Sequence, residues 1–207
     1  MALRGLEPGK RAALLTLECQ RGVIDPEFAS RAGLSEQCEQ RDMIEKIANL
    51  ADAFRAAGMP VVHNKLVHRA DYGGSGVNAP LLGANFKARK MLAGTPQVDL
   101  DPRLRAQPSD YEVDRFTGVT PFHATPLEIL LRNCGVTTVV ITGVSTNLGV
   151  PGAGIEAINR NFSVIFPEDC TAGVWPEAHE FHVVNTLPIL GVVTTSAAVI
   201  EALQATS

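Results

Sequence analysis

Short apolar runs rich in β-branched residues alternate along the chain with longer segments whose apolar residues recur every three or four positions. The short runs predict buried strands, and the longer segments predict amphipathic helices. Their alternation favours βαβ units and a parallel sheet with helices on both faces, which places the chain in the α/β class. The predicted strands are residues 12–17, 61–66, 111–115, 138–142, 162–166 and 192–195.

The predicted helices have recognisable ends. Apolar residues form one stripe over residues 43–54 and a second over residues 127–134, which Gly135 stops in the manner of a helix C-terminal glycine. We expect another helix to begin near Asn147, whose side chain can cap free N–H groups, with Pro151 tolerated in or just after its first turn. Helices at residues 178–187 and 197–203 complete the set.

Residues 68–110 break this alternation. They are rich in Gly and Pro, and stretches this long without strong periodicity are usually lids or binding loops. Within them, residues 86–92 are expected to form a short helix that carries Lys87, Arg89 and Lys90. This basic helix is either a solvated face or an anion-attracting one.

Length and charge limit the possible partners. A chain of 207 residues, 45% of them hydrophobic, can bury one substantial core, so we expect a single domain over residues 1–207. The formal charge of -4 and the absence of a Lys/Arg run argue against a nucleic-acid partner. The early apolar run at residues 12–17 ends at Glu18, far short of the roughly 18 residues that suggest a membrane span. With no signal-peptide cleavage pattern, we expect a cytoplasmic protein that does not associate with membranes.

The cysteines and histidines show no metal-binding pattern. Cys19, Cys38, Cys134 and Cys170 are widely scattered, without a C-x-x-C spacing or a His partner at ligand intervals, so we expect reduced and mostly buried thiols. We expect no metal and no cofactor.

Chemically interesting residues lie at the ends of three predicted strands. Glu18 and Gln20 follow the first strand, Arg115 ends the third, and the fourth leads through Val144, Ser145 and Thr146 towards a helix start. In an open parallel sheet, ligands collect outside the carboxyl ends of the strands. We therefore expect these side chains to converge on one crevice.

The motifs resemble those of the isochorismatase-like, or cysteine hydrolase, superfamily. The segment Leu14-Leu-Thr-Leu-Glu18-Cys-Gln20 is similar to its first strand, which ends in Asp-x-Gln, and Arg115 with the following Phe122 and Thr125 is similar to its Lys followed by an aromatic residue and Thr. Gly143-Val-Ser-Thr146-Asn-Leu-Gly149-Val resembles the turn that carries the catalytic cysteine, which is Gly149 here. The resemblance implies a three-layer α/β/α domain with a mostly parallel, Rossmann-like sheet of about six strands.

The resemblance also implies a set of site residues. Glu18, Arg115 and Gly149 occupy the positions of the catalytic Asp, Lys and Cys. The substrate-binding positions would be Gln20, Phe122, Val144, Ser145 and Thr146. Because a glycine offers no thiol, no thioester can form at residue 149. Isochorismatases proper tolerate glycine there, which implies hydrolysis of a vinyl ether by water with acid assistance from a carboxyl group.

Two functions follow from this pattern. In the first, Glu18 is the general acid, since desolvation in an apolar crevice favours the protonated carboxyl, and the planar guanidinium of Arg115 binds a small anionic substrate. In the second, Glu18 and Arg115 form a bidentate ion pair that fills the crevice, leaving a catalytically silent binding or regulatory module. The family resemblance further implies a homo-oligomer, a dimer or tetramer, because related proteins commonly complete their pockets across subunits.

Overall fold

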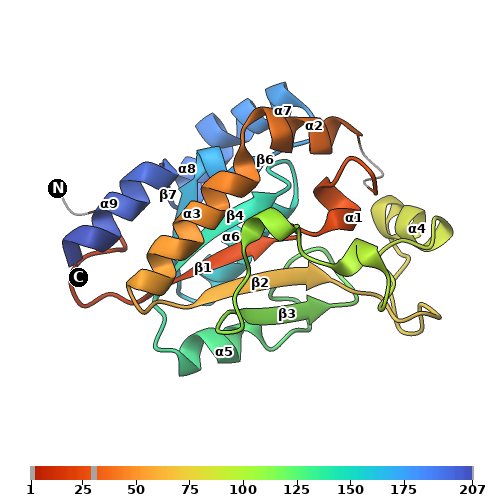
Figure 1. Ribbon diagram of the computed structural model, residues 1–207, viewed down its shortest axis with the longest axis horizontal. Helices are drawn as coiled ribbons and strands as arrows, with labels where there is room; N and C mark the ends of the chain where they lie inside the picture. Colours follow the sequence, from red (N-terminus) through yellow and green to blue (C-terminus); the bar gives the residue numbers. More distant parts are fainter. Residues whose placement is uncertain (1–2, 29–31, 207) are drawn as a thin grey trace.

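The computed structural model describes residues 3–28 and 32–206 as a parallel sheet with helices on both sides (Figure 1). Within these residues the sheet has seven strands, in the order β3-β2-β1-β4-β5-β7, and β6 pairs with β4. All the pairings are parallel, which confirms the predicted α/β class. The strands are β1 (Ala12–Leu17), β2 (Val61–Leu66), β3 (Tyr111–Arg115), β4 (Thr138–Val144), β5 (Ser163–Pro167), β6 (Thr171–Ala172) and β7 (Val192–Thr194).

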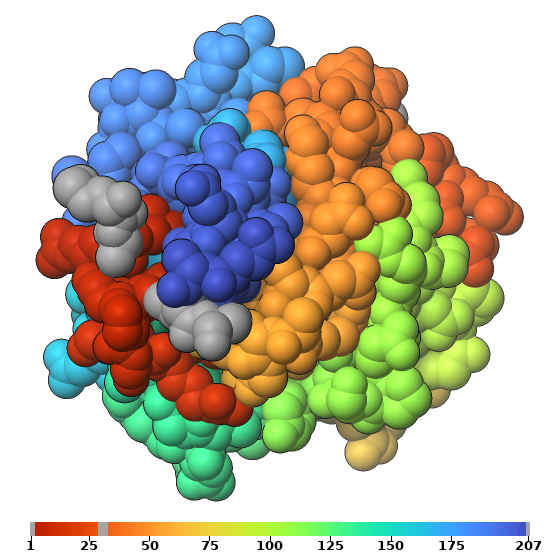
Figure 2. Space-filling model, turned by 60° about the vertical axis from the view of Figure 1, so that its left-hand side comes forward, coloured from red at the N-terminus to blue at the C-terminus, as the bar shows by residue number. Residues whose placement is uncertain are grey.

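Each face of the sheet carries its own apolar cluster. The helices α3 (Met43–Ala56) and α9 (Ser196–Thr206) cover one face and pack against each other (Figures 1 and 2). The helices α5 (Leu127–Asn133), α6 (Gly149–Asn159) and α8 (Leu187–Leu190) contribute apolar side chains to the cluster on the other face. Every residue of β1 is buried, as expected for a central strand covered on both sides.

Predicted and observed elements agree best where the apolar period is strong. Strands β1, β2 and β3 coincide with the predicted ranges, whereas β4 continues two residues further, to Val144. The segment predicted as one helix over residues 178–187 divides into α7 (Pro176–Phe181), a π-helical turn at His182–Thr186 and α8. Helix α6 begins after Leu148, and no side chain caps it. Asn147 does not take the expected capping role, because its Oδ1 accepts a bond from the Val174 N–H at 3.4 Å.

The long segment after β2 builds a separate layer over one end of the sheet. It contains α4 (Pro80–Lys87), which begins six residues before the predicted basic helix because Pro80 starts its first turn. Short 3₁₀ turns follow at Pro96–Val98 and Pro102–Leu104. The His68 N–H donates to Met91 O, and the Ala93 N–H donates to His68 O, both at 2.8 Å. These bonds close residues 69–91 into a loop, here named the roof segment, whose two ends lie side by side.

Strand order reverses between β1 and β4, and the two strands approach closely where they end. Gly143 pairs with Leu17 and has φ of +91°. A Cβ atom at residue 143 would lie 2.3 Å from Leu17 O, so only glycine fits. This reversal is the place where open α/β sheets bind ligands. No helix in the described part of the chain is long and apolar enough to cross a membrane.

Candidate active site

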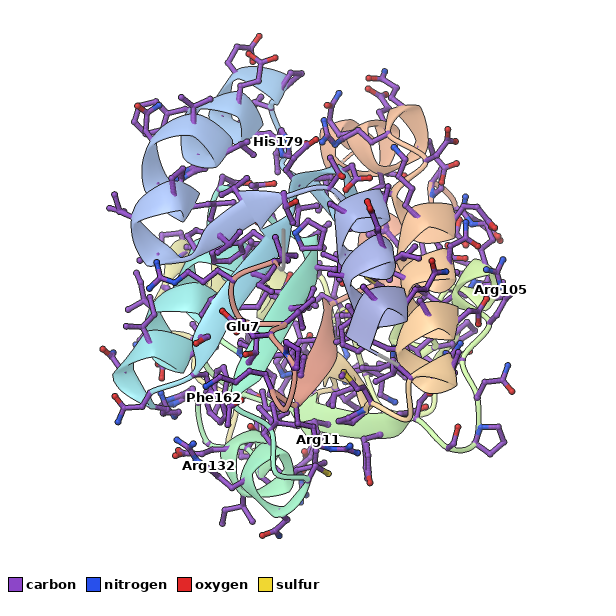
Figure 3. All side chains as sticks on the ribbon, turned by 90° about the vertical axis from the view of Figure 1, so that its left-hand side faces the viewer. Glu7, Arg11, Arg105, Arg132, Phe162 and His179 are labelled. Carbon is purple, nitrogen blue, oxygen red and sulfur yellow. The ribbon has the colours of Figure 1, made fainter. Side chains whose placement is uncertain are left out.

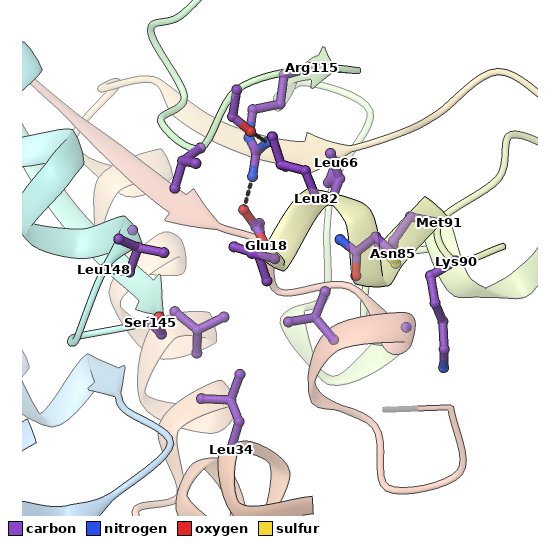
Figure 4. A pocket seen from close by; sticks show the side chains of 17 residues that line it. Glu18, Leu34, Leu66, Leu82, Asn85, Lys90, Met91, Arg115, Ser145 and Leu148 are labelled. Carbon is purple, nitrogen blue, oxygen red and sulfur yellow. Dashed lines mark hydrogen bonds and ion pairs between the residues drawn. The ribbon is translucent and has the colours of Figure 1, made fainter. Parts of the chain in front are cut away.

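A pocket of about 100 Å³ lies at the carboxyl ends of β1, β3 and β4 (Figure 4). Glu18, Arg115, Ser145 and Gly149 form its floor, and Leu82, Asn85 and Met91 of the roof segment contribute to its wall. The wall is mainly apolar, formed by Val23, Leu34, Leu66, Leu81, Leu82, Met91, Val119, Val144 and Leu148. The structure therefore brings the predicted carboxylate, guanidinium and glycine into one mostly apolar pocket.

Glu18 and Arg115 form an ion pair on the pocket floor (Figure 4). The Arg115 Nη2 donates to Glu18 Oε1, while Nη1 donates to Gly118 O at 2.6 Å. Only one carboxylate oxygen is engaged, so the pair is not the bidentate fork considered from the sequence. The Arg115 side chain is 7% exposed, whereas that of Glu18 is 24% exposed and faces the pocket. The pair therefore lines the pocket without filling it.

The turn after β4 places backbone groups beside this pair. The peptide bond between Val144 and Ser145 is cis, and Ser145 O accepts bonds from the N–H groups of Leu148 and Val150 at 3.0 Å. Among the described residues, no acceptor lies against the N–H of Ser145 or of Gly149. A Cβ atom at residue 149 would lie 3.0 Å from Val144 O, so the glycine lets the helix start fit closely against the turn. Both free donors belong to residues that line the pocket.

Two of the expected substrate-binding side chains point elsewhere. Gln20 is fully buried, and its side chain bonds backbone groups of two other segments. Its Nε2 donates to Leu66 O and Val98 O at 3.0 Å, and its Oε1 accepts from the Leu66 N–H at 2.7 Å. Phe122 is 4% exposed and stacks on Phe162 in the core, with 6.1 Å between ring centroids. Their roles in this structure are to join β1 to the next strand and to pack α5 against the sheet.

Thr146 also lies behind the pocket wall. Its N–H donates to Ala172 O and its Oγ1 bonds His179 Nδ1, both at 2.8 Å, so neither group faces a ligand. His179 belongs to α7 and lies on the side of that helix that faces α2 (Ala32–Gln40) (Figure 3). Burial, with smaller contributions from Arg41 and His182, lowers the pKa of His179 to about 4. Neutral His179 thus bonds Thr146 in the turn after β4, behind the pocket wall.

Several pocket residues were not predicted. Asn85 and Lys90 of the roof segment are polar lining residues, and the Lys90 Nζ donates to Phe28 O at 2.7 Å. The basic run around Lys90 was the only sequence signal for them. Asn64 lies in β2 between His63 and Lys65, and it lines a smaller cavity that Glu18 and Arg115 also line.

No cysteine lines the pocket. Cys19, Cys38 and Cys170 are buried, and burial raises the pKa of each thiol, for Cys38 to about 12. Cys134 is partly exposed beside Tyr111, on the far side of β3. In the described ranges, no group of three His, Cys, Asp or Glu side chains gathers as metal ligands would.

Comparison with known proteins identifies the family. Residues 12–198 match the sequence model of the isochorismatase domain. The chain belongs to the isochorismatase family. The uncharacterized isochorismatase family protein YecD of Escherichia coli O157:H7 is 26% identical over 94% of this chain and 97% of its own length. Nicotinamidase 3 of Arabidopsis thaliana is 28% identical over 85% of this chain and 80% of its own.

The isochorismatase fold is equally clear in three dimensions. A cysteine hydrolase from Pseudomonas syringae pv. phaseolicola superposes with a TM-score of 0.85 and 22% identity, covering 100% of this chain and 97% of that protein. This likeness concerns the fold. Relatives within the isochorismatase family include hydrolases by name, as nicotinamidase 3 illustrates.

Proposed function

We propose that this isochorismatase-family protein hydrolyses a small anionic metabolite at a vinyl ether or related bond, using Glu18 as general acid and water instead of a cysteine nucleophile. The observation that carries this proposal is a carboxylate–guanidinium pair on the floor of an open apolar pocket, directly beside a glycine at the helix start. Glycine supplies no nucleophile, so the attacking group must come from solvent.

Arg115 is suited to binding the carboxylate of a substrate. Its guanidinium is always charged, and its planar fork matches a carboxylate. In the unliganded protein one group of this fork, Nη2, donates a hydrogen bond to Glu18. A substrate carboxylate competes for that group, and Glu18, left without its cation in an apolar pocket, then binds a proton more readily. Substrate binding thereby converts the resting ion pair into a neutral acid next to the scissile bond.

The reaction then needs one proton transfer and one attack by water. The Glu18 carboxyl group protonates the terminal carbon of the vinyl ether, water adds to the resulting cation, and the water proton returns to Glu18. Collapse of the hemiketal breaks the ether bond and releases an alcohol and a keto acid. The free N–H groups of Ser145 and Gly149 are placed to bind an oxygen of the reacting group, and Val144 forms an apolar wall beside it.

A specific observation favours a second candidate, a silent binding or regulatory module. The Arg115 guanidinium is already bonded to Glu18 and to Gly118 O, so the pair can act as a structural element of the pocket without taking part in a reaction. In such a module an anionic ligand would bind without turnover.

Calorimetry and turnover assays test the hydrolase. The panel consists of enolpyruvyl ethers, including isochorismate and chorismate, with saturated carboxylates as ligands that cannot react. We expect turnover of at least one ether, and net proton uptake when a saturated carboxylate binds, measured as a dependence of the binding heat on buffer ionisation. Binding without proton uptake and without turnover of any ether would refute the hydrolase and support the silent module.

We also propose that the protein is a homo-oligomer, either a dimer or a tetramer. Exposed apolar side chains recur along residues 175–189, from the start of α7 to α8, where Trp175, Phe181, Val184 and Ile189 are 59% to 80% exposed. Single exposed apolar residues are ordinary, but contiguous patches mark interaction sites. Light scattering coupled to size-exclusion chromatography measures the state directly, and a monomer at micromolar concentration would contradict this proposal.

A further inference from the structure

Asn64 carries a buried acceptor that no described residue satisfies. It lies on β2 next to Leu17 of β1 and is 5% exposed. Its Nδ2 donates a long bond to Val62 O at 3.4 Å, while its Oδ1 has no donor among the described residues. Buried polar atoms almost always have a partner, so an unpaired one indicates a ligand or a water molecule.

The Asn64 side chain faces a small cavity directly below the main pocket. The cavity has a volume of about 10 Å³, and Asn64, Glu18 and Arg115 are its polar lining residues. Gly149 also borders it, so a side chain at residue 149 would project towards this space. Glu18, Arg115 and Gly149 line both this cavity and the main pocket, which makes the two spaces adjoining.

The size and lining of the cavity suit one water molecule. A buried water needs roughly 10–15 Å³ of accessible space and two to four polar partners. Asn64 Oδ1 and the free Oε2 of Glu18 can each accept a hydrogen bond from the water, and the Arg115 guanidinium has further N–H groups to donate to it.

We propose that Asn64 holds a water molecule in this cavity and that this water is the nucleophile of the hydrolysis. The catalytic part of this inference rests on the proposed function, whereas the binding of water does not. Asn64 Oδ1 fixes one O–H bond of the water, so that its second O–H points towards Glu18 and a lone pair towards the main pocket. After Glu18 protonates the substrate, the water oxygen forms the new C–O bond and its second proton passes to the Glu18 carboxylate. Asn64 neither gains nor loses a proton and acts as a positioning residue.

The test combines a crystal structure with kinetics of Asn64→Leu, a change of similar volume that removes the acceptor. In the parent protein we expect an ordered water about 3 Å from Asn64 Oδ1, and in Asn64→Leu we expect that water to be lost. Turnover of the hydrolysed ether should fall on the order of 100-fold in kcat, because the attacking group is no longer held in place, while KM stays within about twofold. The matched control is Val62→Ala, on the same strand and the same face, which should lower the melting temperature without changing kcat.

The outcomes separate this inference from the proposed function. Absence of the water in the parent crystal structure overturns the inference. A higher melting temperature of Asn64→Leu with unchanged kcat also overturns it, because that result would mean that Asn64 Oδ1 has no partner in the folded protein. Wild-type kcat in Asn64→Leu refutes the positioning role and leaves the hydrolase intact. An ordered water in a parent protein that turns over no ether refutes its role as nucleophile together with the proposed function, and leaves only the water site.

Discussion

Glu18→Gln separates the hydrolase from the silent module most sharply. The amide keeps the shape of the side chain but can no longer deliver a proton, and general acid catalysis contributes roughly 10²- to 10⁴-fold. The change also replaces the ion pair with Arg115 by a hydrogen bond from the guanidinium to a neutral amide oxygen, a loss of about 1–2 kcal/mol. In a protein of 207 residues this corresponds to a fall in melting temperature of roughly 2–8 °C.

The control is a second carboxylate in a comparable ion pair. Glu168 bonds Arg41 at 2.6 Å, and its side chain is 32% exposed, close to the 24% of Glu18, but it lies outside the pocket. Glu168→Gln should therefore lower the melting temperature by a similar amount and leave turnover unchanged. Differential scanning calorimetry and initial rates with an excess of the hydrolysed ether measure both quantities in the same preparations.

Two results would refute the reasoning about Glu18. Turnover of Glu18→Gln within threefold of the parent, at equal folded fraction, shows that the carboxyl group is not the acid. An equal loss of turnover in Glu168→Gln shows that the assay reports stability rather than catalysis. The hydrolase predicts a loss of rate specific to residue 18, whereas the silent module predicts only the change in stability.

Three further predictions concern other parts of the chain. Arg115→Met should weaken binding of saturated carboxylates about 10- to 100-fold by calorimetry, because a charge-assisted bond to the ligand is lost; unchanged affinity would place the anion site elsewhere. Gly149→Cys should bring no amidase activity towards nicotinamide, since the new Cβ meets Val144 O at 3.0 Å and Glu18 is already engaged by Arg115; appreciable ammonia release would contradict this. Stability to urea should be greatest above pH 6.5 and fall as the pH decreases to about 4. Burial lowers the pKa of His179 from 6.5 to about 4, so the unfolded chain binds the proton before the folded protein does. His179→Gln should flatten this part of the stability profile, and an unchanged slope would contradict the assignment.

The sequence predicts best those helices and strands whose conformation follows from residues close by in the chain. Residues of α3 bury one continuous stripe, and β1 is apolar except for Thr16, so the local pattern is sufficient. The π-helical turn at His182–Thr186 interrupts a segment whose apolar pattern is continuous, and nothing in that pattern marks the interruption. The basic run of residues 87–90 predicts the centre of a helix, whereas α4 starts at Pro80 and ends at Lys87.

The floor of the pocket could be predicted because strand ends in a parallel sheet meet at one edge. Glu18 directly follows β1, Arg115 ends β3 and Gly149 begins the helix that follows β4, so the topology brings them together. Gln20 also adjoins β1, yet it turns back to bond Leu66 and Val98, 46 and 78 residues away. Such distant partners become visible only when the chain is folded, and the same is true of Asn64.

The way the roof segment joins the protein affects how this pocket can change. Residues 69–91 leave and rejoin the body at one paired position, because His68 bonds both Met91 and Ala93. A loop closed in this manner behaves as an exchangeable cassette, whose length and composition can diverge without altering the register between β2 and β3. A graft of this cassette from one relative to another would therefore exchange one part of the pocket wall while leaving Glu18, Arg115 and Gly149 in place.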